Sequence, residues 1–351
     1  MNDETEKHVM AMLHAHLRGL SKGDPVSPPI VPTAKYVLPG EPDIPYTYGR
    51  DTNQTVEACE VALSALENAP VVAFPCGMSA ITAALMATIK TGHRVLVPSD
   101  GYYVTRALLD EVLSDLGVES VSVPTHDYDG ADFDSFDVVW IETPSNPGLE
   151  TCDIECVSAR ARAAGAVTVV DNTTLTPLLQ RPLDLGADIV VSADTKAIAG
   201  HSDTLFGHLA TRNKDIYEKA KRWRKLSGSV PGPLEAFLTY RGLMTLELRL
   251  ERMCANAEAL LSAIRKTTLY LSPKYPGIGF IVGLTFENAA AADRFIEDCR
   301  AILPATSFGG VHTSAERRAR WGDDVADGYV RLSVGCEPTD ALVSAIIESL
   351  S

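Results

Sequence analysis

One lysine and one aspartate in this chain each follow an apolar run, and their neighbouring residues suit a reactive site. Lys196 follows the apolar run Ile189–Val191, in the segment VVSADTKAIAGHSD, where small and hydroxylic residues surround it. Asp171 follows another apolar run, in the segment VVDNT. A poorly solvated lysine has a lowered pKa, which suits base or nucleophilic chemistry, and a buried carboxylate needs a cationic partner. Both residues are therefore candidates for a reactive centre.

Two further segments could supply an anion site and an aromatic plate. Gly77-Met78-Ser79 in the segment PCGMSA opens a helix, whose free N–H groups and positive dipole end suit an anion such as a phosphate. Tyr102 and Tyr103 follow the run VLVPS and could stack on a flat ligand. A lysine, a carboxylate, an anion cradle and a stacking ring are what pyridoxal 5′-phosphate requires of a protein. These residues therefore predict a site for that cofactor.

The surrounding pattern places these residues at the ends of strands. Apolar runs of strand length are separated by helical stretches; they lie at Val71–Phe74, Arg94–Pro98, Ser120–Val123, Val138–Ile141, Val167–Val170 and Ile189–Val191. Continuous apolar strands that alternate with helices indicate an α/β fold with a mostly parallel sheet covered on both faces. Ligands bind beyond the carboxyl ends of such strands, which is where the candidate residues fall.

The pattern divides the chain into three segments. Residues 1–55 form an N-terminal helix and a Pro-rich extended arm, residues 56–235 a large cofactor-binding domain, and residues 236–351 a smaller C-terminal α/β domain. The last part predicts one long helix, a strand, a second helix, a strand and a closing helix, at Leu234–Ile264, Phe280–Phe286, Ala289–Ile302, Tyr329–Gly335 and Asp340–Leu350.

Composition and charge narrow the class of partner. The chain is 46% hydrophobic and 22% charged, as in globular proteins, and its 31 Lys+Arg against 46 Asp+Glu give a net charge of −15. Such a surface repels nucleic acid and anionic membranes, which favours a small molecule or another protein as the partner. The N-terminus lacks the features of a signal peptide, and seven cysteines suggest reduced thiols, so a cytoplasmic location is expected. No metal site is predicted.

Seven segments occur in an order that resembles a known family; they are YGRDTNQT, FPCGMSAIT, Asp100–Arg106, WIETPSNP, VDNT, TKxxxGHSD and VRLSVG. The chain resembles the Cys/Met-metabolism family of pyridoxal-phosphate enzymes from about residue 30 to its C-terminus. That family contains cystathionine γ-synthase, cystathionine γ- and β-lyases and methionine γ-lyase. The resemblance implies the fold type I architecture, like that of aspartate aminotransferase.

The resemblance also implies roles for the candidate residues at the cofactor. Lys196 would hold the cofactor as a Schiff base and act as the catalytic base, Asp171 would pair with the ring nitrogen, and Tyr102 would stack on the ring. The phosphate would be held by Gly77, Met78 and Thr195. Bound in this way, the protonated ring can act as an electron sink.

Other residues are implied to come from a second subunit or to bind substrate. Tyr48 and Arg50, on the arm, would reach the cofactor phosphate of a neighbouring subunit, so the resemblance implies a homo-oligomer with shared active sites, a dimer of dimers. Asn146, Ser307 and Arg331 resemble the residues that bind the amino-acid substrate, with Arg331 on its α-carboxylate.

The chain departs from the family pattern at several places. Ala193 stands where the family usually has Ser, so one hydrogen bond to the phosphate is expected to be missing. Thr47 and Thr306 stand where γ-synthases and γ-lyases often carry Glu, whose charge would offset the distal ammonium of cystathionine. Tyr103 adds a second bulky ring beside the plate formed by Tyr102.

The implied function is that of a carbon–sulfur lyase of the transsulfuration pathway, of the cystathionine γ-lyase type, giving cysteine, 2-oxobutanoate and ammonia. A γ-synthase acting on an O-acylhomoserine is a close alternative, followed by a cystathionine β-lyase or a methionine γ-lyase. A nucleotide-binding oxidoreductase would need a G-x-G-x-x-G turn, and FPCGMSA has a single glycine. A catalytically silent module of the same fold is a further alternative, against which Lys196 and Asp171 argue.

Overall fold

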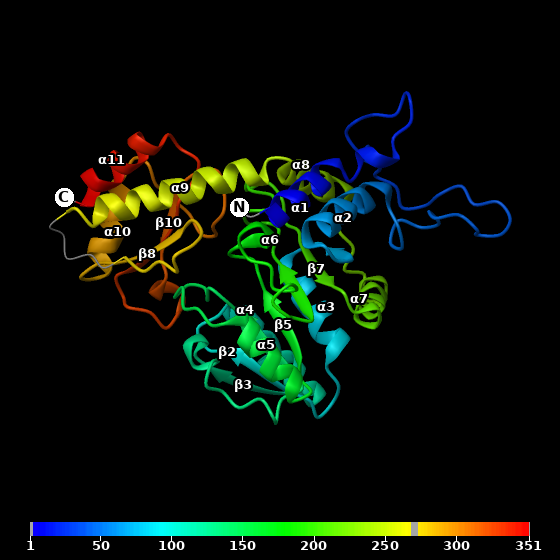
Figure 1. The fold of residues 1–351 in the computed structure, drawn as a ribbon, viewed down its shortest axis with the longest axis horizontal. Helices are drawn as coiled ribbons and strands as arrows, with labels where there is room; N and C mark the ends of the chain where they lie inside the picture. The colour runs from blue at the N-terminus through cyan, green and yellow to red at the C-terminus, as the bar shows by residue number, and fades with distance from the viewer. Residues whose placement is uncertain (1–2, 268–272, 351) are drawn as a thin grey trace.

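The computed structural model describes residues 3–267 and 273–350, which are built around two β-sheets (Figure 1). The large sheet has seven strands in the order β1-β7-β6-β5-β4-β2-β3. They are β1 (Val71–Phe74), β2 (Arg94–Pro98), β3 (Glu119–Val123), β4 (Val138–Glu142), β5 (Val167–Asp171), β6 (Ile189–Ser192) and β7 (Gly207–Thr211). Strands β2 to β6 pair in parallel, and β7 runs antiparallel to both β1 and β6. The expectation of a mostly parallel sheet is confirmed.

Apolar side chains on alternate positions of these strands bury both faces of the large sheet. In β4, Val138 and Trp140 face one core cluster, whereas Val139 and Ile141 face another. The first face is covered by α3 (Gly77–Thr88) and α7 (Lys214–Ser227), and the second by α2 (Gln54–Glu67), α5 (Ile154–Ala163) and α8 (Pro233–Leu243). Because both faces are covered, the free edge for a ligand is the carboxyl end of the strands.

The second sheet has four strands in the order β8-β11-β10-β9. They are β8 (Ile281–Thr285), β9 (Leu303–Pro304), β10 (Ser314–Arg317) and β11 (Tyr329–Ser333). One core cluster joins β8, β10 and β11 to α10 (Ala289–Asp298), α11 (Thr339–Leu350) and the C-terminal half of the long helix α9 (Leu246–Ile264). Figure 1 shows α9 running between this small sheet and the elements around the large one.

The N-terminal part begins with α1 (Asp3–His14), which packs on α2. Between these helices the chain forms the extended arm, which carries an isolated β-bridge between Lys35 and Tyr48 and which Figure 1 shows reaching away from the body. Two short helices, α4 (Tyr103–Ala107) and α6 (Thr176–Leu179), follow β2 and β5. Within the described ranges, no helix has the length and apolar character needed to cross a membrane.

The single helix predicted over Leu234–Ile264 is wrong, because α8 ends at Leu243 and α9 begins at Leu246. Gly242 lies so close to the turn after β6 that an added Cβ would sit 2.4 Å from the Ala199 carbonyl oxygen. The guanidinium of Arg249 donates to the carbonyl oxygens of Ala197 (2.6 Å) and Gly242 (2.8 Å). Two helices packed around one turn therefore replace the straight helix that local periodicity favours.

The segment predicted as one helix over Arg106–Leu116 is also less regular than expected. After α4 it widens into a π-helical stretch over Leu108–Leu113 and then tightens into a 3₁₀ turn over Ser114–Leu116. Strand β7 was not predicted at all, since its sequence GHLAT contains Gly207 and a histidine and has no strand-like apolar run.

Candidate active site

A cavity of about 350 Å³ opens at the carboxyl ends of β4, β5 and β6, and its other side is lined by Arg331 of β11 and by residues of the segments before and after β10. It brings together every predicted site residue except Tyr48 and Arg50; those that line it are Gly77, Met78, Tyr102, Asn146, Asp171, Thr195, Lys196, Ser307 and Arg331. Residues distant in sequence thus meet at one place, as expected for a ligand site in an α/β protein. The described part of the chain holds no group of three or more His, Cys, Asp or Glu side chains placed to bind a metal ion.

Lys196 lies on the turn after β6, and its Nζ faces the cavity. The Nζ donates to Ser307 Oγ at 2.6 Å and lies 5.0 Å from the centre of the Phe308 ring. Burial lowers the pKa of Lys196 to about 8, and the nearby guanidinium groups of Arg331 and Arg318 act in the same direction. The amine is therefore largely neutral at mildly alkaline pH, as a nucleophile or base must be.

The turn that carries Lys196 is held rigidly from the opposite side. Arg249 is buried, and its guanidinium donates to the carbonyl oxygens of Ala197 and Ile198, at 2.6 and 2.9 Å. Gly309 lies so close that a Cβ there would be 2.5 Å from the Ala197 nitrogen. This close packing fixes the backbone of the lysine, and the Ser307 loop lies directly against it.

Asp171 ends β5 and is 6% exposed. The Thr173 amide and hydroxyl both donate to Asp171 Oδ1, at 3.0 and 2.5 Å. Burial raises the pKa of Asp171, while the Thr173 hydrogen bonds and the charge of Lys196 oppose that rise. Because both Thr173 bonds fall on Oδ1, Oδ2 remains for a cationic ligand group, such as a protonated ring nitrogen.

The start of α3 forms a cradle of backbone N–H groups. The amides of Ser79 and Ala80 turn back to the carbonyl oxygen of Cys76, at 3.1 and 3.3 Å, and a helix has no internal partner for its first amides. The N–H groups of Gly77 and Met78 are therefore available to a ligand anion, at the positive end of the helix dipole.

Close backbone approach shapes this cradle. A Cβ on Gly77 would lie 2.5 Å from the Cβ of Ala193, and one on Gly207 would lie 2.7 Å from the Cys76 carbonyl carbon. Ala193 adds no hydroxyl, and its amide donates to Thr173 Oγ1 at 2.8 Å. The cradle fits a phosphate through backbone amides, and the Thr195 hydroxyl lines the same cavity.

Arg331 on β11 is 4% exposed and is held by two groups beside the cavity. It donates to Asn146 Oδ1 through Nη1 and to the Ser307 carbonyl oxygen at 3.0 Å through Nη2. Within the described residues, its buried Nε has no hydrogen-bond partner. An oriented guanidinium with an unmatched donor is suited to bind a carboxylate.

Other side chains that the sequence motifs do not mark as site residues also line the cavity, chiefly those of Glu142, Arg318 and Trp321. Buried Glu142 accepts the amides of Tyr102 (2.6 Å) and Asn146 (3.1 Å), so one carboxylate positions both the ring and the amide side chain. Burial, followed by the charge of Asp171, raises the pKa of Glu142 well above its ordinary value. The motif ETPSNP could have identified Glu142, whereas Arg318 and Trp321 lie in no motif.

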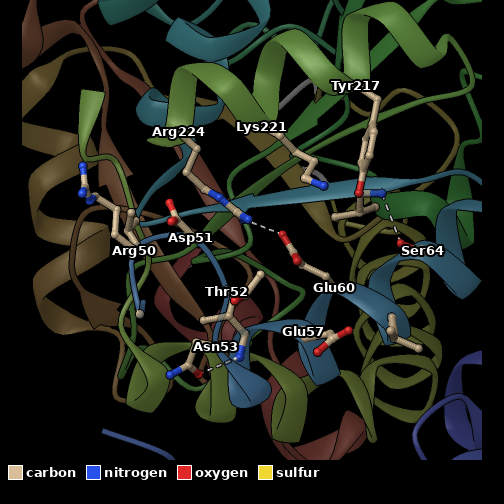
Figure 2. Close-up of a pocket in the computed structure, with 15 residues that line it drawn as sticks. Arg50, Asp51, Thr52, Asn53, Glu57, Glu60, Ser64, Tyr217, Lys221 and Arg224 are labelled. Atoms are coloured by element: carbon tan, nitrogen blue, oxygen red, sulfur yellow. Dashed lines mark hydrogen bonds and ion pairs between the residues drawn. The ribbon is translucent and has the colours of Figure 1, made fainter. Parts of the chain in front are cut away.

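Tyr48 and Arg50 do not reach the Lys196 cavity of their own chain. The Arg50 guanidinium lies over the Tyr48 ring at 5.3 Å, and Tyr48 is 43% exposed. Figure 2 shows Arg50 instead at a separate pocket, between the end of the arm, α2 and α7, where Arg224 donates to Glu60 at 2.6 Å. The two arm residues thus lie outside the Lys196 cavity of their own chain.

Comparisons with known proteins show what the whole chain is similar to. A family model described as "Cys/Met metabolism PLP-dependent enzyme" matches residues 11–351. A protein of Streptomyces coelicolor named "Putative cystathionine gamma-lyase" is 40% identical, with 94% of this chain and 90% of that protein covered. The cystathionine gamma-synthase of Mycobacterium bovis is 35% identical, with 87% and 86% covered. The crystal structure of metB from Corynebacterium glutamicum superposes with a TM-score of 0.93 at 30% identity, over 100% of this chain and 99% of that one.

Proposed function

Because the chain belongs to the Cys/Met-metabolism family of pyridoxal-phosphate-dependent enzymes, we propose that it cleaves the Cγ–S bond of L-cystathionine. The overall reaction consumes one water and gives cysteine, 2-oxobutanoate and ammonia. The relative of 40% identity carries the name of a γ-lyase, which supports this choice over the other reactions of the family. The observation that carries the proposal is Lys196: a partly buried amine with a pKa of about 8, set between a carboxylate and an arginine in one cavity.

The residues of the cavity fit the cofactor. Gly77 and Met78 would hold the phosphate through their amides, Asp171 would hold the protonated ring nitrogen through Oδ2, and Tyr102 would cover the ring. Bound pyridoxal phosphate supplies an aldehyde that takes up the substrate amine and a ring that accepts the electrons released at Cα.

Lys196 and Arg331 would carry out the remaining tasks. Arg331, oriented by Asn146 and Ser307, would bind the α-carboxylate and so aim the Cα–H bond. The Nζ of Lys196 would remove the proton at Cα and later the one at Cβ, which allows the sulfur on Cγ to leave. Its contact with Ser307 Oγ keeps the amine directed at the substrate between these steps.

A second copy of the chain would complete the site. The arm exposes large apolar side chains, among them Val26 (72%), Val37 (91%) and Ile44 (46%), which favours burial against a partner. Tyr48 and Arg50 lie at the end of this arm, and the planar guanidinium of arginine suits a phosphate. The enzyme would therefore be at least a dimer with active sites shared between subunits.

The test is to give the purified, cofactor-loaded protein L-cystathionine and to identify the keto acid. We expect 2-oxobutanoate in a one-to-one ratio with cysteine. Lys196→Ala should abolish the reaction, whereas Lys214→Ala, which removes an exposed lysine at the start of α7, should leave it unchanged.

The other outcomes separate the remaining candidates. Pyruvate with homocysteine would show a β-lyase instead. Cystathionine formed from O-succinyl-L-homoserine and cysteine, without keto acid from cystathionine, would show γ-replacement, which the mycobacterial γ-synthase relative favours as the second candidate. A protein that remains colourless with excess pyridoxal phosphate would exclude all of these reactions.

A further inference from the structure

The small sheet contains a buried carboxylate that none of the steps above uses. Glu316 lies on β10 and is 1% exposed, and in the antiparallel pairing of β10 with β11 it stands directly opposite Arg331. Residues opposite each other in such a pair have neighbouring side chains. The strand register itself therefore brings this carboxylate to the arginine that is aimed at the substrate.

Four N–H donors converge on the two oxygens of Glu316. Arg318 Nη1 (2.7 Å) and Arg331 Nη2 (3.3 Å) donate to Oε2, while Arg320 Nη2 (3.0 Å) and Trp321 Nε1 (2.6 Å) donate to Oε1. An ionised carboxylate offers about four acceptor positions, so these contacts saturate it. Burial alone would raise the pKa of Glu316, but the donors from Arg320, Trp321 and Arg318 outweigh burial and hold that pKa below its ordinary value.

Three of these four donors, Arg318, Trp321 and Arg331, line the candidate active-site cavity. Arg318 is buried and also pairs with Asp323 at 2.6 Å, so a carboxylate other than Glu316 offsets part of its charge. The Trp321 ring is 58% exposed although its Nε1 reaches the buried Glu316. Within the described residues, Glu316 is the one carboxylate at ion-pair distance from Arg331. Without it, two adjacent guanidinium groups would repel each other at the cavity wall.

We propose that Glu316 is a positioning residue that fixes Arg331 for the α-carboxylate of the substrate and ties it to Trp321 at the edge of the cavity. The inference rests on the proposed function, since it assigns Arg331 to an amino-acid carboxylate. It goes further by naming the group that holds this arginine in place and by linking it to an exposed ring. Glu316 itself touches neither substrate nor cofactor.

The test compares two small amines that differ only in the carboxylate. Glycine and methylamine both displace Lys196 from the cofactor, and the change in the visible spectrum of the holoenzyme reports each dissociation constant. In Glu316→Gln the charge is lost at nearly constant volume, so we expect the dissociation constant of glycine to rise at least about tenfold. The dissociation constant of methylamine should change by less than about twofold, because methylamine has no carboxylate for Arg331 to bind.

Two further variants test whether the effect is specific to Glu316. Asp293→Asn breaks the 2.9 Å ion pair with Arg317, whose side chain lies on the opposite face of β10 from that of Glu316. This variant should change the dissociation constant of neither amine. Trp321→Phe removes only one donor to Glu316. It should raise the dissociation constant of glycine about threefold and leave that of methylamine unchanged. If Glu316→Gln fails to fold, Trp321→Phe decides by the same pattern of glycine against methylamine.

Two results would overturn the inference. One is a variant that retains the cofactor and binds glycine as tightly as the parent; the other is an equal loss of glycine and methylamine, which would mark a general structural defect. Failure of the proposed function looks different, because the parent protein would then form no 2-oxobutanoate from cystathionine, whereas the comparison of glycine with methylamine needs only a cofactor that binds an amino acid.

Discussion

At the scale of single residues, burial and neighbouring cations make Lys196 reactive. The amine is packed beside Phe308 and Ser307 and near two guanidinium groups, so the protonated form is disfavoured. Burial also acts on Asp171, where it raises the pKa of the carboxyl. A cationic ring nitrogen bound beside this carboxyl would stabilise its ionised form. Each group therefore has its charge state set by what surrounds it in the cavity.

The pKa of Lys196 leads to a prediction for the apoprotein. Only the neutral amine attacks an aldehyde, and a pKa lowered to about 8 makes this form predominate above about pH 8. The rate of covalent uptake of pyridoxal phosphate, trapped with borohydride and measured by mass, should rise with pH, reach half its maximum near pH 8 and level off at about pH 9. An ordinary lysine would keep gaining rate up to about pH 10.4. Arg331→Gln should move the plateau to higher pH, and a curve that still climbs above pH 9 in the parent would contradict the assignment.

The sequence could predict residues that follow an apolar strand within a distinctive motif. Lys196, Asp171 and the Gly77 turn were located in this way, because the carboxyl ends of parallel strands meet at one edge. Glu316 and Trp321 could not be located, since their role depends on the register of β10 against β11 and on a connection that has no motif. Local sequence patterns therefore predict which edge of a sheet binds the ligand. They do not predict which side chains of a second sheet will face that edge.

At the scale of elements, β7 shows why part of the fold escaped prediction. Its residue His208 is fully buried between two carboxylates, donating or accepting at Asp194 (2.8 Å) and Glu67 (3.1 Å). A strand with a buried histidine lacks the apolar pattern that marks the others. The contact links α2, the Lys196 turn and β7, so three elements depend on one side chain.

The same contact predicts a loss of stability on mutation. Burial alone would lower the pKa of His208, but Asp194 and Glu67 raise it to about 10. Because this value exceeds that of an unfolded histidine, about 6.5, the stabilisation is complete below about pH 6.5 and disappears as pH rises toward 10. His208→Leu leaves two buried carboxylates unpaired and should lower the free energy of unfolding at pH 7 by about 3–5 kcal/mol.

Urea unfolding measured between pH 6 and 10 checks this prediction. The difference in free energy of unfolding between the parent and the His208 variant should shrink as pH rises. The matched control is His126→Gln, whose ion pair with Asp127 is exposed (62% and 59%) and should contribute less than about 1 kcal/mol. A His208 variant as stable as the His126 variant would show that the buried pairs do not stabilise the fold.

At the scale of the whole molecule, the proposed second subunit would explain why Tyr48 and Arg50 lie away from the Lys196 cavity of their own chain. Each chain holds Lys196, Asp171 and the phosphate cradle in one cavity, while its own Arg50 lies at another pocket, between α2 and α7. In a two-fold symmetric dimer each arm would serve the other subunit's cavity. In the proposed dimer the arm would couple assembly to catalysis, because a single chain would lack Tyr48 and Arg50 at its own cavity.

This coupling can be tested by mixing two inactive variants. Lys196→Ala lacks the reactive amine but has a normal arm, whereas Arg50→Ala has a normal cavity but should bind the cofactor phosphate weakly. If sites are shared, a mixed dimer contains one site with both defects and one with neither. Random reassociation makes about half of the dimers mixed, so about a quarter of the parental activity should return at limiting cofactor. Activity that stays at the sum of the separate variants would show that each chain uses its own Arg50 or none, and the arm would then need another explanation for its exposed apolar residues.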